Sequence, residues 1–508
     1  MRFAFPSLCL AFLTSLAGCS TAPSDYACEP GELQVCPCIG GAEGVQACAD
    51  EREGWAECQC PDEDGVGGSG SGGVGGADTS SGDSGVDVDD GGHEASLSES
   101  VDSGRVDADL SDEGLRPETP PFIDEALGCA PSAEPFTKSG DTHHKVTLTD
   151  PRATCNDGTP GVMYIKPSTR AEAAQLWVVH LQGGGSCRTP AECTARWCDV
   201  SGRMSSRGTP ASIQSEGIFS VLPRNTAAHA NQVFVYYCSS DNFAGRMNEV
   251  VVDGPEHTPY RIDFNGDAIL NAALDALEAG ARSDDGETVL PPLTDASMLI
   301  LSGSSAGCTA VTYQGERVAQ RLATHGVSTR LICDGSLSPM PEHLENPETV
   351  SGLSAHRAES FAIRMDMQDL NLDESCIAAT APDEVYLCES AGWVLPNYVD
   401  TVPLFIYTDQ GDPVLWSGYR MAGLSITEFA AGVRAGLTDA ATADTPTPIS
   451  VFGPRCNVHT ALHHNDRFLN WTVTTPDGRL TFHDALVRWL QGEHVVAVES
   501  AETNSGCD

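Results

Sequence analysis

Residues 299–311 read LILSGSSAGCTAV, in which an apolar run enters a turn of small residues and helix-forming residues follow. The turn, Gly303-Ser304-Ser305-Ala306-Gly307, has the pattern G-x-S-x-G between a strand and a helix, which is the context of a nucleophile elbow. The helix start would direct backbone N–H groups and a positive dipole end at a developing oxyanion. The sequence therefore predicts Ser305 as a nucleophile and Ser304 as a residue that points elsewhere.

Similar apolar runs recur on both sides of this stretch and alternate with segments of helical character. Continuous apolar strands that alternate with helices predict a mostly parallel sheet with helices on both faces. We therefore expect an α/β fold, as one domain over 126–508 with insertions. The expected strands are 176–181, 233–238, 298–303, 330–335, 403–409 and 448–453, and the expected helices are 267–280, 309–326 and 483–492.

A serine hydroxyl needs a base, and the base needs an acid to orient it. In hydrolases of this architecture the order along the chain is Ser, acid, His. Candidate acids are Asp409 and Asp412 after strand 403–409, and Asp334 after strand 330–335.

Histidines follow the next strand, 448–453. His459 is the candidate base, whereas we expect His463 and His464 to be solvated or capping residues. The remaining histidines, including the pair His143-His144, are expected at the surface.

Glycines 183–185 and Ser186 follow strand 176–181. Glycine lets backbone N–H groups approach a tetrahedral intermediate closely, so this loop is a candidate oxyanion hole. A phosphate-binding loop is excluded because the G-K-[ST] ending is absent.

Five stretches in order resemble the pectin acetylesterase and Notum family of carboxylesterases: LQGGGSC (181–187), YYCSSDNFAGR (236–246), SGSSAGC (302–308), FIYTDQGDPVLW (405–416) and RCNVH (455–459). The resemblance covers approximately 129–495 and implies an α/β-hydrolase-like fold. It implies Ser305, Asp412 and His459 as a triad, with oxyanion donors at Gly185, Ser186 and Ala306. It also implies that no metal or cofactor is required.

Two positions depart from the family pattern. Ser186 stands where members usually carry Trp, and Cys308 stands where they carry a second Gly. The first change removes a bulky wall near the acyl pocket and bears on substrate size. We expect Cys308 to pack or to pair with another Cys.

The resemblance implies hydrolysis of ester-linked acyl groups, either O-acetyl on a polysaccharide or a fatty acyl group on a protein. A lipid-chain deacylase of Notum type is thus the first alternative. A non-catalytic surface glycan-binding protein on a hydrolase fold is the second.

The N-terminus predicts export. Arg2 precedes an apolar stretch that is too short to span a membrane, so 1–18 are expected to be a signal peptide. Its ending, LAGC, resembles the bacterial lipobox, which implies lipidation at Cys19, a lipidated N-terminus over 19–27 and anchoring at the outer membrane, on the periplasmic side or the cell surface. An ordinary secretory signal is the alternative.

Outside the signal and Cys19, the chain has 18 Cys, six within 28–60 and twelve within 126–508. Even sets in an exported chain indicate disulfides, and C-x-C spacing fits zinc poorly. Residues 28–60 are therefore expected to form a small disulfide-rich module. Residues 61–125, dominated by Gly, Ser and Asp, are expected to be a disordered acidic linker.

The formal net charge is −44, which excludes nucleic-acid binding because no basic patch is available to neutralise phosphates. The large domain alone, with 46 acids and 24 bases, has a net charge of −22. Its charge disfavours strongly anionic glycans, although salt screens the effect beyond about 8–10 Å.

Overall fold

The computed structural model describes residues 33–37, 43–47, 119–129, 139–254, 258–420, 422–503 and 505–507. The chain divides into two compact units, Met1–Gly114 and Leu115–Asp508. In the first unit, β1 (Leu33–Pro37) pairs antiparallel with β2 (Glu43–Ala47). The predicted signal peptide, Cys19, the cysteines of the small module other than Cys36 and residues 61–118 of the predicted linker lie outside the described residues.

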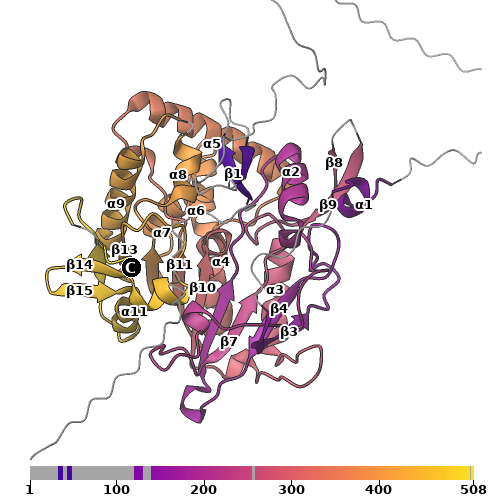
Figure 1. Cartoon of the computed structure of the whole chain (residues 1–508), viewed down its shortest axis with the longest axis horizontal. Coiled ribbons are helices and arrows are strands. Elements are labelled where there is room, and N and C mark those ends of the chain that lie inside the picture. The colour runs from indigo at the N-terminus through magenta and orange to yellow at the C-terminus, as the bar shows by residue number, and fades with distance from the viewer. Residues whose placement is uncertain are drawn as a thin grey trace, which may run out of the picture. The chain divides into compact units, whose positions relative to one another are not determined.

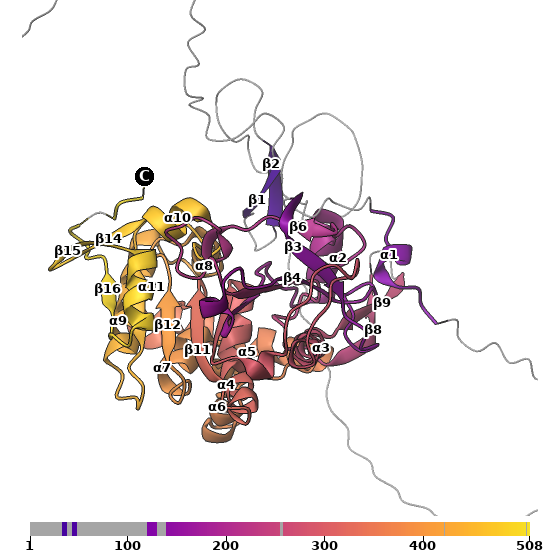
Figure 2. The ribbon, with the colours of Figure 1, turned by 90° about the horizontal axis from the view of Figure 1, so that it is seen from below.

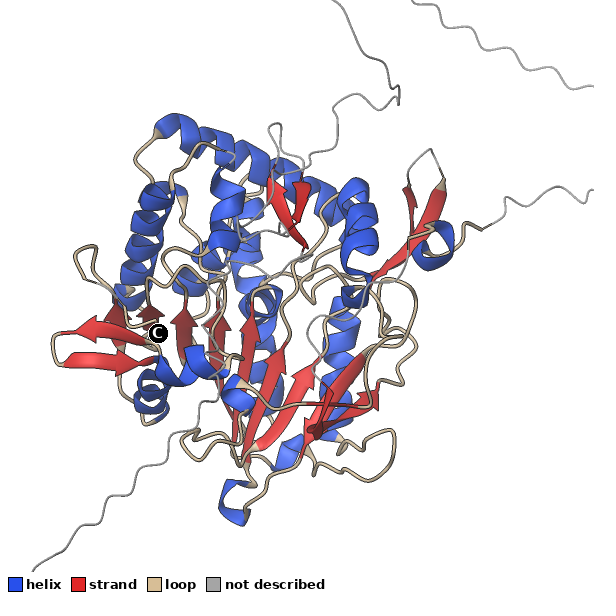
Figure 3. Cartoon of the chain, in the orientation of Figure 1, coloured by secondary structure: helices blue, strands red, loops and turns tan. Residues whose placement is uncertain are grey.

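A ten-stranded sheet forms the centre of the described second unit, in the order β16-β13-β12-β11-β10-β5-β7-β4-β3-β6 (Figures 1 and 3). Neighbours from β16 to β7 are parallel, and the remaining pairs are antiparallel. The prediction of a mostly parallel sheet is therefore confirmed. The strands are β3 (Ser139–Thr147), β4 (Val162–Lys166), β5 (Leu176–Leu181), β6 (Ser212–Ile213), β7 (Asn231–Val235), β10 (Met298–Ser304), β11 (Ser328–Asp334), β12 (Leu404–Tyr407), β13 (Ser450–Gly453) and β16 (Val496–Val498).

All six predicted strands are present within a few residues of their expected limits, and β5 matches its prediction at both ends. Their side chains are nearly all buried because helices cover both faces of the sheet. The antiparallel strands β3, β4 and β6 were not predicted. Two further hairpins also escaped prediction: β8 (Met247–Asp253) with β9 (Pro259–Phe264), and β14 (Thr472–Thr475) with β15 (Gly478–Thr481).

Helices α4 and α11 cover opposite faces of the sheet (Figure 2). Leu331 of β11 packs against Gly315 of α4, whereas its neighbour Arg330 reaches the carbonyl of Trp489 in α11. Successive side chains of a strand point to opposite faces, so the two helices lie on different sides. The helices are α1 (Ile123–Ala126), α2 (Pro190–Val200), α3 (Gly266–Glu278), α4 (Ala306–Ala323), α5 (Pro347–Gln368), α6 (Glu374–Ala379), α7 (Ala391–Asn397), α8 (Pro413–Arg420), α9 (Ile426–Thr442), α10 (Asn465–Asn470) and α11 (Phe482–Leu490).

The folded unit begins before residue 126, so the last residues of the expected linker, 61–125, belong to the folded unit. Ile123 is fully buried, and the guanidinium of Arg261 in β9 lies 4.3 Å from the ring centroid of Phe122. Phe122 and Ile123 are apolar, so the end of the expected linker has side chains that can be buried. The residues before them are mostly Gly, Ser and Asp, which offer little apolar surface.

The expectation that the remaining histidines lie at the surface is wrong for His143, His180 and His483, which are at most 4% exposed. His180 lies on β5 between apolar neighbours, and its Nδ1 is 3.0 Å from the hydroxyl of Ser302 on β10. Because a strand that is buried on both faces is apolar almost throughout, its sequence pattern does not show which face of the sheet a single polar side chain points to. None of the helices in the described residues is long and apolar enough to cross a membrane.

Candidate active site

The predicted nucleophile lies at the junction of β10 and α4. Ser305 follows the last strand residue and precedes the first helical one, with φ 54° and ψ −120°. Positive φ is strained for a residue with a side chain, and such strain is concentrated at functional sites. The N–H of Ser305 donates to the carbonyl of Asp334 at 2.8 Å, which fixes the turn against β11.

Two glycines allow this turn to contact the loop after β5. A Cβ on Gly307 would lie 2.0 Å from the carbonyl oxygen of Leu181, and a Cβ on Gly183 would lie 2.6 Å from that of Ser304. Any larger residue would force the two segments apart. The candidate oxyanion loop therefore packs directly against the candidate nucleophile.

One hydrogen-bonded chain joins three predicted side chains. His459 Nε2 lies 2.7 Å from Ser305 Oγ, and His459 Nδ1 lies 2.8 Å from Asp412 Oδ2. Asp412 is fully buried, whereas the side chain of His459 is 21% exposed. The structure thus brings Ser305 together with two residues that are each more than 100 positions away from it in the sequence, in the geometry of a nucleophile, a base and an orienting acid.

The turn after β12 positions Asp412. Its Oδ1 accepts the N–H groups of Val414 and Leu415 at the start of α8, at 2.9 and 3.0 Å. Burial raises the pKa of Asp412, and the adjacent His459 opposes that rise. Because the helix start occupies one oxygen, the other remains directed at the imidazole.

The rival acids bind elsewhere. Asp409 accepts the N–H groups of Gly411, Cys456 and Asn457, and Asp334 accepts those of Ala461 and Leu462. Both carboxylates are fully buried. In the described structure, neither forms a hydrogen bond with the imidazole of His459.

The rival histidines also lie apart from Ser305 Oγ. His464 occupies the N-cap position of α10, but its side chain forms no capping hydrogen bond there. The ring of His463 packs between His180 and His464, and its Nδ1 is 3.2 Å from Ser304 Oγ, so the expectation that His463 is solvated is wrong. Ser304 points away from the site, and its hydroxyl donates to Asp334 Oδ2 at 2.6 Å.

The loop after β5 is held on several sides. Arg196 of α2 donates from Nη2 to the carbonyl of Gly184 at 2.6 Å and from Nε to Ser240 Oγ at 2.8 Å. The carbonyl of Cys187 accepts from Gln368 Nε2 at 2.6 Å, and its sulfur is bonded to Cys193. These contacts hold the backbone of the loop in one conformation.

Several backbone N–H groups of this region, including those of Gly183 and Gly184, donate no hydrogen bond within the described residues. Among the hydrogen bonds of the described residues, none is donated by the backbone N–H of Gly185, Ser186 or Ala306. Gly185 is exposed, Ser186 is partly exposed and Ala306 is buried, and N–H groups that have no acceptor within the protein can bind an anionic oxygen. The family resemblance implies Gly185, Ser186 and Ala306 as the oxyanion donors, and their role stays a prediction.

The twelve cysteines of the large domain form six disulfides, as their even number predicted. Cys308 pairs with Cys333, so the start of α4 is bonded to the end of β11. Cys456, three residues before His459, pairs with Cys507. The other pairs are Cys129–Cys198, Cys155–Cys238, Cys187–Cys193 and Cys376–Cys388.

Some residues of this region were not found from the sequence. Arg196, Gln368 and Ser336, whose hydroxyl donates to the carbonyl of Ser305 at 2.8 Å, belong to no motif. They act through contacts with segments that are distant in the chain, and no local pattern marks them.

Buried ionisable groups lead to a prediction about stability. Burial raises the pKa of Asp241 and Asp334 to about 6 and that of Asp409 to about 7, and it lowers the pKa of His143 and His180 to about 3. Carboxyls with raised pKa bind more protons when folded, so their contribution to stability is lost as pH rises through 6–7. The histidines bind protons only when unfolded, so stability is also lost as pH falls below about 6.5.

We therefore expect the thermal midpoint of unfolding to fall as the pH rises through about 7, where unfolded histidines are largely neutral and the carboxyl of Asp409 is still losing its proton, when it is measured by differential scanning fluorimetry at constant ionic strength. In Asp409→Asn the decline on the alkaline side should be shallower. A midpoint that rises steadily from pH 6 to 9 would contradict this reading.

The chain is similar to known carboxylesterases. The pectinacetylesterase family model matches residues 137–415, a range that contains Ser305 and Asp412 and ends before His459. The palmitoleoyl-protein carboxylesterase NOTUM of Homo sapiens is 32% identical over 181 residues, which are 35% of this chain and 32% of that protein. Pectin acetylesterase 5 of Arabidopsis thaliana is 28% identical over 235 residues, 46% and 49% of the two chains.

The chain thus spans between a third and a half of the length of these relatives. The structure of the Wnt deacylase Notum from Drosophila aligns with a TM-score of 0.57 at 22% identity, covering 72% of this chain and 98% of that one. This likeness shows a shared fold. Because the family model matches more than half of the sequence, the chain belongs to the pectinacetylesterase family.

Proposed function

We propose that this protein is a serine carboxylesterase that removes ester-linked acyl groups, with O-acetyl groups on an extracellular polysaccharide as its substrate. The observation that carries the proposal is the continuous hydrogen-bonded chain from Asp412 through His459 to Ser305, beside three unpaired N–H groups in the described structure. Family membership supports the same chemistry.

In the proposed mechanism, Ser305 Oγ attacks the ester carbonyl while His459 Nε2 accepts its proton. Asp412 stabilises the imidazolium through Nδ1–H, and the N–H groups of Gly185, Ser186 and Ala306 bind the oxyanion. His459 then protonates the departing alcohol oxygen, which leaves an acyl-enzyme. Water deprotonated by His459 attacks that ester, and the carboxylic acid is released.

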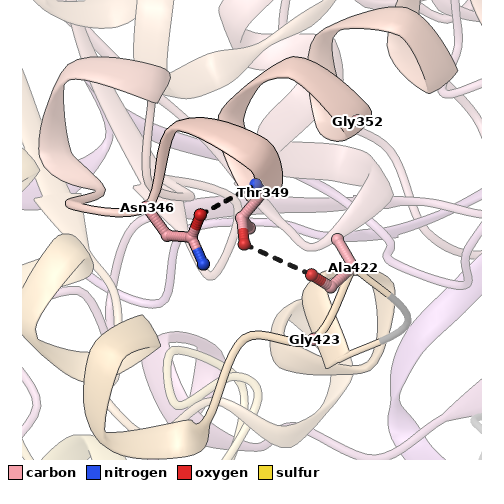
Figure 4. Close-up of a pocket in the computed structure, with 5 residues that line it drawn as sticks. All are labelled: Asn346, Thr349, Gly352, Ala422 and Gly423. Atoms are coloured by element: carbon pink, nitrogen blue, oxygen red, sulfur yellow. Dashed lines mark hydrogen bonds between the residues drawn. The ribbon is translucent and has the colours of Figure 1, made fainter.

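Two cavities of the described structure lie away from the three side chains of the proposed triad. A cavity of about 300 Å³ lies between the start of α5 and the loop after α8, where Thr349 Oγ1 donates to the carbonyl of Ala422 (Figure 4). A second, of about 310 Å³, lies beside α4 and residues 371–375. Neither is lined by Ser305, Asp412 or His459, and an acetyl group, unlike a sixteen-carbon chain, requires no long apolar cavity.

A series of p-nitrophenyl esters from acetyl to palmitoyl tests this choice. With the full chain, kcat/KM for the acetyl ester should exceed that for the palmitoyl ester by at least about tenfold, since longer chains would leave apolar surface in water. Release of acetate from a neutral acetylated glycan extends the test to polymers. Faster cleavage of the palmitoyl ester would instead support the deacylase alternative suggested by the likeness to NOTUM.

We further propose that the protein is exported and anchored through a lipid on Cys19 at the outer membrane. The six disulfides support an oxidising compartment, where such bonds persist. Mass spectrometry of the mature N-terminus tests the anchor. A mature protein that begins after Cys19 with an unmodified residue would reject it.

A further inference from the structure

The segment that carries His459 is held on both sides by buried carboxylates. Upstream of the imidazole, Asp409 Oδ2 accepts the N–H of Cys456 at 2.6 Å and its Oδ1 accepts the N–H of Asn457 at 3.1 Å. Downstream, Asp334 Oδ2 accepts the N–H of Leu462 at 2.9 Å, and its Oδ1 accepts that of Ala461 at 3.1 Å.

The upstream contact holds a strained backbone. Asn457 has φ 55°, which costs free energy for a residue with a side chain. Its N–H donates to Asp409, and its side-chain oxygen lies so close to Gly411 that a Cβ there would be 2.1 Å away. Such a conformation persists only where its surroundings impose it, and here two consecutive N–H groups of the segment donate to one buried carboxyl.

The downstream contact connects the base to the nucleophile. The backbone carbonyl of Asp334 accepts the N–H of Ser305 at 2.8 Å, while its side chain holds Ala461 and Leu462. The hydroxyl of Ser304 donates to the same carboxylate at 2.6 Å. One residue therefore fixes the backbone beside Ser305 and the backbone beside His459.

We propose that Asp334 and Asp409 are positioning residues for the base, and that together they set the distance between the imidazole of His459 and Ser305 Oγ. The proposal rests on the proposed esterase function. It assigns separate roles to the three acids that follow β11 and β12: Asp412 orients the ring, and the other two hold its backbone from either side.

Isosteric variants test the proposal in the full chain. Asp409→Asn and Asp334→Asn should each lower kcat for p-nitrophenyl acetate by about 10–100-fold, because a misplacement of about 1 Å can cost that much. KM should stay within twofold, since neither carboxylate borders the ester. Asp334→Ala should lose more activity than Asp334→Asn, which retains one acceptor oxygen.

A matched control is provided by Glu316, a buried acid that accepts the N–H and hydroxyl of Thr401. Glu316→Gln should keep kcat within twofold of the wild type. Equal losses in this variant would show a general effect of removing buried charge and would overturn the proposal, as would wild-type kcat in Asp334→Asn and Asp409→Asn.

Hydrogen exchange of the wild-type protein supplies a test that no folding defect can obscure. The amides of residues 456, 457, 461 and 462 should be protected nearly as well as those of the core strands. Exchange as fast as in an exposed loop would overturn the proposal. If the wild type hydrolyses no ester, the proposed function fails, and this exchange measurement still decides whether the two carboxylates hold the segment.

Discussion

Ser305→Ala is expected to reduce kcat for p-nitrophenyl acetate by about 10⁴–10⁶-fold, the loss typical of removing the nucleophile of a serine hydrolase. The hydroxyl lies 2.7 Å from the base and is half-buried beside unpaired N–H groups of the described structure, so no other group is placed to form the acyl-enzyme. Initial rates measured with the full-length wild type and variant at equal concentration give the ratio.

Ser297→Ala is the matched control because Ser297 is exposed just before β10, at the other end of the strand that leads to Ser305, and its hydroxyl meets only the carbonyl of Gln175 at 3.2 Å. Its rate should equal that of the wild type. A fluorophosphonate probe should label the wild type on the peptide that contains Ser305. Turnover by Ser305→Ala at the wild-type rate, or a label on another serine, would reject the proposed nucleophile.

Much of the fold was predictable because its central strands are buried on both faces. Runs such as Leu176–Leu181 must be apolar throughout, which makes them visible in the sequence. Of the strands towards one edge of the sheet, β3 is mostly polar and β6 has only two residues, so both lack this signal, whereas β4 (Val162–Lys166) is apolar except for its last residue and was missed although it carries the signal. Helices α5, α6 and α7, which lie between β11 and β12, and α8, which follows β12, were also not predicted.

The site likewise has residues that the sequence identifies and residues that it does not. The elbow around Ser305 is local, so a short pattern with its flanking strand and helix identifies the residue. Strand ends place Asp334, Asp409 and Asp412 in one region, but the direction of each side chain depends on which N–H groups surround it. Those N–H groups belong to residues 411–415 and 456–462, and their positions depend on how these segments fold. The sequence alone therefore left three candidates for the triad acid, and the family resemblance favoured one of them.

Disulfides reinforce each of the three segments that meet at Ser305. Cys187–Cys193 holds the oxyanion loop, Cys308–Cys333 holds the elbow, and Cys456–Cys507 holds the segment of His459. Their pairing could not be deduced from the sequence, because twelve cysteines allow many connectivities. The arrangement suits a protein outside the cytoplasm, because disulfides persist in oxidising compartments.

Asp412→Asn is expected to lower kcat by about 10³–10⁴-fold while the fold is retained, as seen when the orienting acid of a triad becomes an amide. The amide oxygen can still accept the N–H groups of Val414 and Leu415 in place of Oδ1. Its NH₂ group then replaces Oδ2, 2.8 Å from His459 Nδ1, and presents a donor to that nitrogen. The imidazole must respond by placing its proton on Nε2, where it faces Ser305 and cannot accept the hydroxyl proton.

Comparison of Asp412→Asn with Asp409→Asn separates orientation of the ring from support of its backbone. The first variant should lose at least about tenfold more kcat than the second, because a wrong tautomer blocks proton transfer whereas a loosened segment only weakens it. Thermal midpoints measured alongside kcat exclude unfolding as the cause. A larger loss in Asp409→Asn would instead mean that Asp409 acts as the acid and that the bond between Asp412 and His459 is not the one used in catalysis.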